Sequence, residues 1–197
     1  MKMSKKRGTI FIIMGTLLML SALSLFLYNR YEDARAGKES EKLLSDLQTA
    51  LEEDQEDALS EDLPPELPVV EMEGYGYIGY LSIPSLELEL PIMSEWDYDR
   101  LKIAPCRHFG SSRTDDLVIA AHNYKKHFGY LSQLESGATV FFMDMDGIKN
   151  EYEVTLVQTL VPTDVEAVQK SDHDLALYTC TYGGKARMAV FCDRLEK

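Results

Sequence analysis

The chain has 197 residues, a length that fits one domain with appendages. Its 33 acidic and 20 basic residues give a formal net charge of −13, which argues against a nucleic-acid-binding protein because such proteins need a basic surface. Hydrophobic residues make up 45% of the chain, which excludes disorder throughout, and three cysteines are too few for a disulfide-stapled scaffold.

The first segment is basic and then apolar. Residues 1–28 carry four basic residues and no acidic ones, and residues 9–28 carry no charge at all. As a helix, these 20 residues span about 30 Å, the hydrocarbon thickness of a bilayer. The pattern predicts a cytoplasmic tail over residues 1–8 and a transmembrane helix over residues 9–28, with everything after it outside the cell. A cleavable signal peptide is the alternative, although its apolar core is typically only about 7–15 residues long.

The second segment, residues 29–73, is predicted to be an acidic stalk. Residues 29–70 carry 13 acidic and four basic residues, and an acidic helix is expected over residues 31–62. Pro64, Pro65 and Pro68 end any helix. A stripe of apolar residues follows helical spacing, and it consists of Leu43, Leu44, Leu47, Ala50 and Leu51. We interpret the segment first as a solvated spacer, with docking of the stripe as a lid, or on another copy, as the alternative.

The third segment, residues 74–197, has the texture of a mainly β domain. Short runs rich in β-branched and aromatic residues alternate with turn signals, which favours a closed β-barrel or a sandwich with a few short helices. The predicted strands are residues 77–83, 86–92, 117–122, 138–144, 151–161, 175–182 and 186–193. Short helices are expected within residues 96–102, 128–133 and 164–169, and Gly183-Gly184 is expected to form a hairpin turn.

Three residues at strand ends are candidates for catalysis. Cys180 and His122 each end a predicted strand, and Arg187 begins the strand after the Gly-Gly turn. A cysteine nucleophile needs a partnered base, and a histidine within reach supplies one. An arginine can donate hydrogen bonds to a developing oxyanion. Residue types alone do not establish catalysis, since a buried structural cysteine is common.

The arrangement of these residues resembles the sortase family of cysteine transpeptidases. The family signature is a Leu-x-Thr-Cys strand with an arginine seven to nine residues later, and here it is Leu177-Tyr178-Thr179-Cys180 with Arg187. The family histidine lies about 60 residues upstream, and His122 precedes Cys180 by 58. The resemblance covers roughly residues 74–195.

Two further segments carry the same resemblance. Residues 77–84 match the opening strand of the family, Gly-x-Leu-x-Ile-Pro, and residues 116–123 match its histidine strand. The chain departs from the family at Ala121, where glycine is more usual, and at Ala176, where the family motif has a threonine. The Cys-Thr-Tyr continuation and the asparagine after the histidine look most like class B sortases.

The resemblance implies a sorting reaction on the cell surface. Cys180 would attack a C-terminal sorting motif of a secreted surface protein, and the acyl group would pass to an amine of a cell-wall peptide or of a pilin lysine. His122 would transfer protons, Arg187 would stabilise the oxyanion or position the peptide, and Thr179 and Asn123 would contact the substrate. No metal or organic cofactor is required, although some members bind Ca²⁺ through acidic loops, and Asp144 and Asp146 flank a turn here.

Other interpretations remain open at this point. A cysteine hydrolase would use the same site and differ only in the nucleophile that resolves the acyl-enzyme. A non-catalytic membrane-anchored binding domain would bury Cys180 instead. Cys106 and Cys192 are open to interpretation as buried residues, a disulfide pair or free thiols. His108, His127 and His173 are expected at the surface, and the lack of an HExxH arrangement argues against zinc.

Overall fold

The computed structural model describes residues 3–54 and 64–195, with one long helix followed by a β-rich part. These residues form two compact units that divide between Arg35 and Ala36, and each unit is described by itself. Helix α1 spans Met3–Asp54 and contributes to both units.

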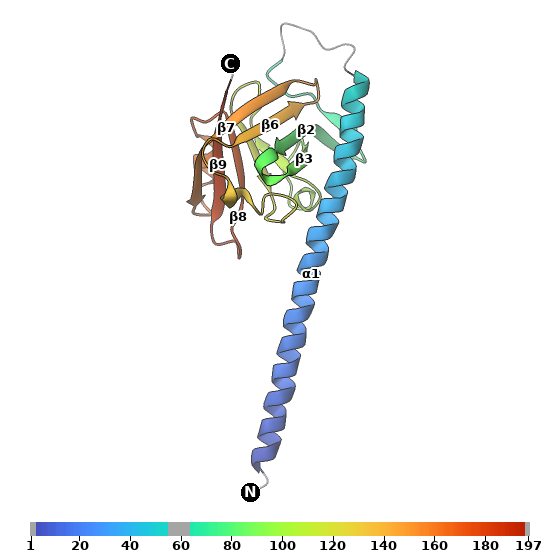
Figure 1. Cartoon of the computed structure of the whole chain (residues 1–197), viewed down its shortest axis with the longest axis vertical. Helices are drawn as coiled ribbons and strands as arrows, with labels where there is room; N and C mark the ends of the chain where they lie inside the picture. Colours follow the sequence, from blue (N-terminus) through green and yellow to red (C-terminus); the bar gives the residue numbers. More distant parts are fainter. Residues whose placement is uncertain (1–2, 55–63, 196–197) are drawn as a thin grey trace. The chain divides into compact units, whose positions relative to one another are not determined.

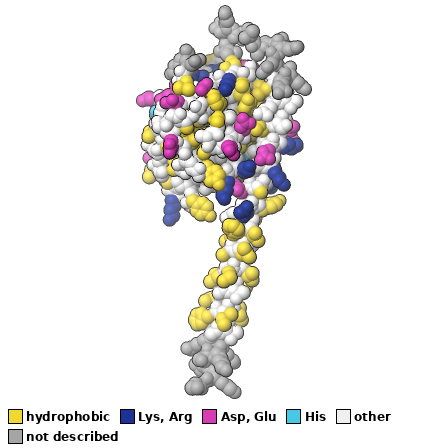
Figure 2. Space-filling view, in the orientation of Figure 1, with side chains coloured by type: hydrophobic (Ala, Val, Ile, Leu, Met, Phe, Trp, Pro, Cys, Tyr) yellow, Lys and Arg dark blue, Asp and Glu magenta, His cyan; other side chains and the backbone are white. Residues whose placement is uncertain are grey.

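The first unit is the apolar part of α1. Its large apolar side chains between Ile10 and Tyr28 are all at least half exposed. Figure 2 shows apolar side chains, in yellow, along this part of the helix. Within the described residues, α1 is the one helix that is long and apolar enough to cross a membrane. A helix of this length and composition is consistent with a single-pass membrane anchor.

The second unit contains a closed barrel of strands β2 to β9 (Figure 1). The strands neighbour one another in the order β2-β3-β4-β5-β8-β9-β7-β6, and pairing of β2 with β6 closes the ring. Pairs β3–β4 and β5–β8 are parallel and the other pairs are antiparallel. The prediction of a mainly β, closed barrel is confirmed.

The strand bounds agree with the predicted runs to within two residues. They are β2 (Tyr75–Ile83), β3 (Leu88–Met93), β5 (Leu117–Ala121), β6 (Thr139–Asp144), β7 (Lys149–Leu160), β8 (Leu175–Cys180) and β9 (Arg187–Arg194). Two strands were not predicted, namely β1 (Val70–Met72), which extends the sheet at β2, and β4 (Cys106–Phe109). Strand β4 has no apolar alternation because Arg107 and His108 occupy its middle.

Short helices lie inside the three predicted ranges. They are η2 (Arg100–Lys102), η3 (Leu131–Gln133) and α2 (Val165–Gln169), and a fourth, η1 (Pro84–Leu86), lies between β2 and β3. None of them exceeds five residues, so the strands alone determine the architecture of the barrel.

Strand β5 is buried on both faces, which makes it a rigid support for the residue that follows it. All five of its side chains are buried. Ile119 belongs to the apolar cluster that fills the barrel, whereas Ala120 belongs to a second apolar cluster on the opposite face of the sheet. Alternation along the strand therefore directs one set of side chains inward and the other outward.

The leucine stripe of α1 packs against the β domain. Leu43, Leu47 and Leu51 are buried and belong to the second apolar cluster, together with Ala120 and Tyr178. The solvated-spacer interpretation therefore does not hold for these three leucines, which dock on the β domain of the same chain. Residues 55–62 of the predicted acidic helix lie outside the described residues.

Candidate functional site

The parallel pairing of β5 and β8 aligns His122 with Cys180. Every Cα pair between these strands joins residues 58 positions apart, and the last pair is Ala121 with Thr179. One step further in the same register are His122 and Cys180. Because neighbouring strands lie about 4.8 Å apart, the imidazole and the thiol start from adjacent backbone positions.

The antiparallel pairing of β8 and β9 places Arg187 directly opposite Cys180. Facing residues of an antiparallel pair project from the same face of the sheet, with Cα atoms about 4.5–5.5 Å apart. The guanidinium Nη1 of Arg187 donates hydrogen bonds to the carbonyls of Ala186 at 3.1 Å and Gly184 at 3.3 Å. The register thus gathers the three predicted residues at one end of three adjacent strands.

A tight hairpin fixes the separation of Cys180 and Arg187. Thr181 donates its N–H to the Ala186 carbonyl at 3.0 Å, and its Oγ1 accepts the Ala186 N–H at 3.0 Å. Gly183 and Gly184 have φ values of 82° and 71°, a left-handed conformation that favours glycine. The turn expected at the Gly-Gly pair is confirmed, and Tyr182 on the same hairpin is 93% exposed.

Thr179 faces away from Cys180. Alternation along β8 puts it on the barrel side, where it is buried, and its Oγ1 donates a 2.8 Å hydrogen bond to the Ala121 carbonyl. Its hydroxyl therefore links β8 to β5, and the Thr179 side chain is not available to contact a substrate peptide. Asn123, the other residue expected to contact substrate, is half-buried directly after His122.

The surroundings of His122 favour its neutral form. Burial lowers the pKa of His122, and the positive charge of Lys102 lowers it further. The ring of Tyr124 lies 5.0 Å from the imidazole, centroid to centroid, and the His122 carbonyl accepts the Phe128 N–H at 3.2 Å. A neutral imidazole is the form that accepts a proton from a thiol or an amine.

A row of aromatic rings extends from the face of Cys180. Tyr178 shares that face of β8, and its hydroxyl is hydrogen-bonded to His108 Nδ1 at 3.1 Å. The His108 ring lies 5.5 Å from Trp96, and the Trp96 ring lies 4.8 Å from Tyr98. Trp96 and Tyr98 are exposed, so this row of rings forms a partly exposed aromatic surface on the same face of the sheet as the thiol of Cys180.

Tyr178 lies within the electrostatic reach of both Cys180 and Arg187. Burial raises the pKa of Tyr178 to about 12, the charge of Arg187 opposes this rise, and Cys180 adds to it. The pKa of His108 is lowered by burial. The hydrogen bond between Tyr178 and His108 therefore joins two neutral groups at neutral pH.

The three cysteines have different surroundings. All are free thiols, but Cys106 and Cys192 are buried, whereas Cys180 is partly exposed. Burial raises the pKa of Cys106 to about 12 and also raises that of Cys192. A buried thiol with a raised pKa is a poor nucleophile, so Cys180 is the thiol suited to attack a substrate.

The acidic turn after β6 is occupied by an arginine. Arg113 donates hydrogen bonds to Asp144 Oδ2 at 3.1 Å and to Asp146 Oδ2. Asp144 Oδ1 accepts the N–H groups of Asp146 and Ile148. Among the described residues there is no group of three or more His, Cys, Asp or Glu side chains that could hold a metal ion.

Two histidines lie deeper than the sequence indicates. His127, expected at the surface, is 1% exposed, with its Nε2 at 3.1 Å from the Ser40 hydroxyl. His108 is half-buried against Tyr178. Both contacts join residues 70 or more positions apart, so no local sequence pattern predicts them.

Comparison with known proteins identifies relatives of the domain. The family model described as Sortase domain matches residues 81–195, more than half of the chain. No curated protein sequence is significantly similar to this chain.

Several solved structures share the fold. Sortase C1 of Streptococcus agalactiae is 24% identical, with 64% of this chain and 72% of that chain covered and a TM-score of 0.55. A Clostridium perfringens sortase C with the C-terminal cell wall sorting motif is 23% identical, with 79% and 91% covered and a TM-score of 0.55. The Clostridium perfringens sortase D5 transpeptidase is 18% identical, with 80% and 99% covered and a TM-score of 0.61. Likeness at these identities shows the fold and assigns no class.

Proposed function

Since this chain belongs to the sortase family of cysteine transpeptidases, we propose that it cleaves a C-terminal sorting motif of secreted proteins and transfers the product to an amine. The observation that carries this proposal is the register that brings His122, Cys180 and Arg187 to one end of β5, β8 and β9. The Clostridium perfringens sortase C with its sorting motif supports a substrate of this kind.

Acylation begins with Cys180. Its Sγ attacks the carbonyl carbon of the scissile peptide bond while the thiol proton passes to His122. Arg187 donates a hydrogen bond to the oxygen that becomes negatively charged. The imidazolium of His122 then protonates the departing amine, the C–N bond breaks, and a thioester remains on Cys180.

Transfer reverses the proton movements. The incoming amine attacks the thioester carbonyl and loses a proton to His122, and the second tetrahedral intermediate collapses with Cys180 as the leaving group. An amine of a cell-wall peptide or of a pilin lysine is the acceptor in this proposal. The neutral state of His122 favoured by its surroundings suits this step, because the imidazole has to accept the proton of the amine.

The proposed location is the outer face of the cell membrane. Residues 9–28 span the bilayer, the basic residues 1–8 remain in the cytoplasm, and the catalytic domain of residues 74–197 lies outside. Residues 29–73 connect the two. Support comes from the long apolar helix and from the four basic residues that precede its uncharged run.

The test follows the fate of a peptide. The full chain in detergent is incubated with fluorogenic peptides taken from the C-termini of secreted proteins that end in an apolar span and a basic tail. Cys180→Ala should abolish cleavage, whereas Cys192→Ala, the same substitution at a buried thiol, should retain it. Cleavage by Cys180→Ala would overturn the proposed nucleophile. Ligation to an added amine distinguishes transfer from hydrolysis, and release of free acid alone would contradict the transpeptidase.

A further inference from the structure

Ser40 of α1 connects two loops that reach His122. The side chain is 2% exposed, and its hydroxyl donates a 2.9 Å hydrogen bond to the Ile103 carbonyl in the loop between β3 and β4. The same hydroxyl lies 3.1 Å from His127 Nε2 in the loop between β5 and β6. Lys102 on the first loop acts electrostatically on His122, and the second loop begins at His122 itself.

The hydrogen-bonding capacity of Ser40 determines the direction of both contacts. A hydroxyl has one hydrogen to donate, and Ser40 uses it on Ile103. It must therefore accept its second bond from the Nε2–H of His127, which places the proton on Nε2 and leaves Nδ1 as an acceptor. His127 Nδ1 is buried without a hydrogen-bond partner among the described residues, as fits an unprotonated nitrogen, and burial lowers the pKa of His127 to about 4.

Tyr124 continues the contacts from His127 to His122. Its ring centroid lies 5.4 Å from that of His127 and 5.0 Å from that of His122. Backbone bonds close the same loop, from His127 N–H to the Tyr124 carbonyl at 3.0 Å and from Phe128 N–H to the His122 carbonyl at 3.2 Å. Ser40, His127, Tyr124 and His122 thus form one contiguous series of contacts.

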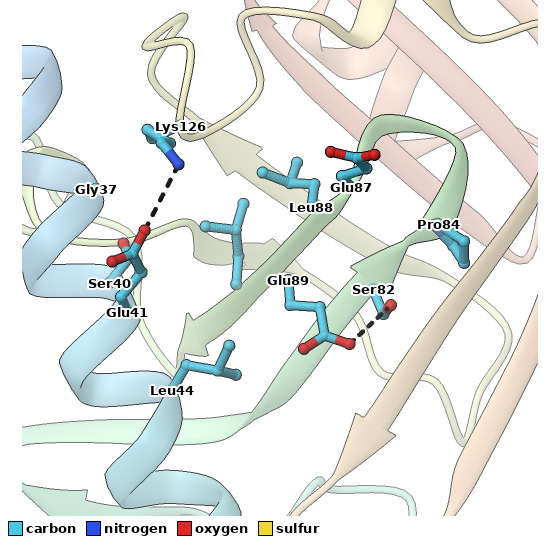
Figure 3. A pocket seen from close by; sticks show the side chains of 11 residues that line it. Gly37, Ser40, Glu41, Leu44, Ser82, Pro84, Glu87, Leu88, Glu89 and Lys126 are labelled. Atoms are coloured by element: carbon cyan, nitrogen blue, oxygen red, sulfur yellow. Dashed lines mark hydrogen bonds and ion pairs between the residues drawn. The ribbon is translucent and has the colours of Figure 1, made fainter.

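Other contacts also join α1 to this loop, and one is a hydrogen bond between His127 and the backbone of Ala36. The ion pair of Glu41 with Lys126 is exposed at both ends, and such pairs contribute little. Figure 3 shows this pair spanning from the helix to the loop. The two residues border a hollow of about 460 Å³ that is lined mainly by α1 and β3. Gly37 lets the helix approach, since a Cβ there would lie 2.8 Å from Lys126 Cγ. Ser40 is the side chain that contacts both loops, through the Ile103 carbonyl and the His127 ring.

We propose that Ser40 is a positioning residue for His122. By holding Ile103 and His127 in place, it fixes the loops on which the imidazole depends and keeps that ring aligned with Cys180. This inference rests on the proposed function, because it takes His122 as the group that transfers protons. It also makes the docked part of α1 an integral part of the catalytic unit.

The test compares variants of the full chain in detergent. Ser40→Ala removes both hydrogen bonds, Ser40→Cys keeps the volume while weakening them, and Ser40→Thr retains the hydroxyl. Ser45→Ala, an exposed position of the same helix, is the matched control. Ser40→Ala and Ser40→Cys should lower kcat about tenfold with KM unchanged, because a less well positioned His122 transfers protons more slowly, whereas Ser40→Thr should restore the rate.

Amide hydrogen exchange gives a readout that does not need activity. In Ser40→Cys, exchange should accelerate over residues 122–130 and remain unchanged in β8 and β9. Wild-type kcat together with wild-type exchange in Ser40→Cys would overturn the role of Ser40 while leaving the proposed function intact. If the wild type forms no acyl-enzyme, the proposed function fails, and unchanged exchange over residues 122–130 would then reject the structural link as well.

Discussion

Ala121 and Thr179 face each other in the parallel pair of β5 and β8, and the Thr179 hydroxyl donates a 2.8 Å hydrogen bond to the Ala121 carbonyl. This bond lies one residue before both His122 and Cys180. It therefore stabilises the strand register that aligns His122, the proposed general acid and base, with Cys180, the proposed nucleophile.

Loss of this hydrogen bond should lower both the free energy of unfolding and kcat. Thr179→Val keeps the shape of the side chain but leaves the Ala121 carbonyl without the bond, which should cost about 1–2 kcal/mol of unfolding free energy. We also expect kcat to fall, because the alignment of His122 with Cys180 loosens.

Thr155→Val is the matched control. Thr155 likewise donates a hydrogen bond to a backbone carbonyl, that of Phe191, at 3.1 Å on the β7–β9 pair. It should lose similar stability in chemical denaturation and keep its kcat. Equal effects of the two substitutions on kcat would show that the Thr179 bond has no special relation to the site.

Arg187 should not tolerate replacement by lysine. Lysine keeps the positive charge but lacks the planar fork of the guanidinium, so Arg187→Lys and Arg187→Ala should both lower kcat, by about 10²–10³ for loss of an oxyanion donor. Lys185→Ala, at an exposed position of the same hairpin, should be close to wild type in steady-state peptide cleavage. A wild-type rate for Arg187→Lys would remove Arg187 from the site.

The pKa of His127 makes stability depend on pH. Burial holds this pKa at about 4, below the ordinary value of 6.5, so the folded protein keeps His127 neutral while the unfolded chain takes up a proton. Stability should therefore be fully present above pH 6.5 and fall as the pH decreases towards 4, by up to ~3 kcal/mol.

His127→Gln tests this dependence. Glutamine offers an N–H donor to Ser40 but does not titrate, so the decline in unfolding free energy between pH 6.5 and 4 should become shallower. Urea denaturation at several pH values measures it. An identical decline in the variant would assign the acid sensitivity to other groups.

Much of this site could be predicted from local sequence. The interval of 58 residues between His122 and Cys180 equals the register offset of β5 and β8, and the Gly-Gly turn fixes Arg187 opposite Cys180. Short apolar runs bounded by turn residues reveal each of these strands.

The parts that could not be predicted depend on distant contacts. Lys125 and Lys126 make His127 look like a surface residue, yet Ser40, 87 positions earlier, covers it. The leucines of α1 have the spacing of an amphipathic helix. The local sequence does not show whether they pack against the barrel, against another copy of the chain or against nothing but solvent. Arg113 reaches Asp144 and Asp146 across more than 30 positions, and a turn with two acids alone resembles a cation site.

Calcium should have no effect on this turn. Arg113 occupies one oxygen of each of Asp144 and Asp146, and the other oxygen of Asp144 accepts two backbone N–H groups. Millimolar Ca²⁺ should leave the Tm unchanged in a thermal scan. A Tm that rises with Ca²⁺ and returns on chelation would contradict the role of Arg113 as the resident cation.

The central claim is that Cys180 forms a covalent acyl-enzyme, and intact-protein mass spectrometry tests it most directly. With a cleavable sorting peptide, the mass of the full chain should increase by that of the N-terminal peptide fragment. A tryptic digest should place this added mass on the peptide that contains Cys180. The added mass should disappear when an amine is supplied. The adduct should be absent from Cys180→Ala. Peptide turnover without any adduct at Cys180, or an adduct that maps to another residue, would contradict the account.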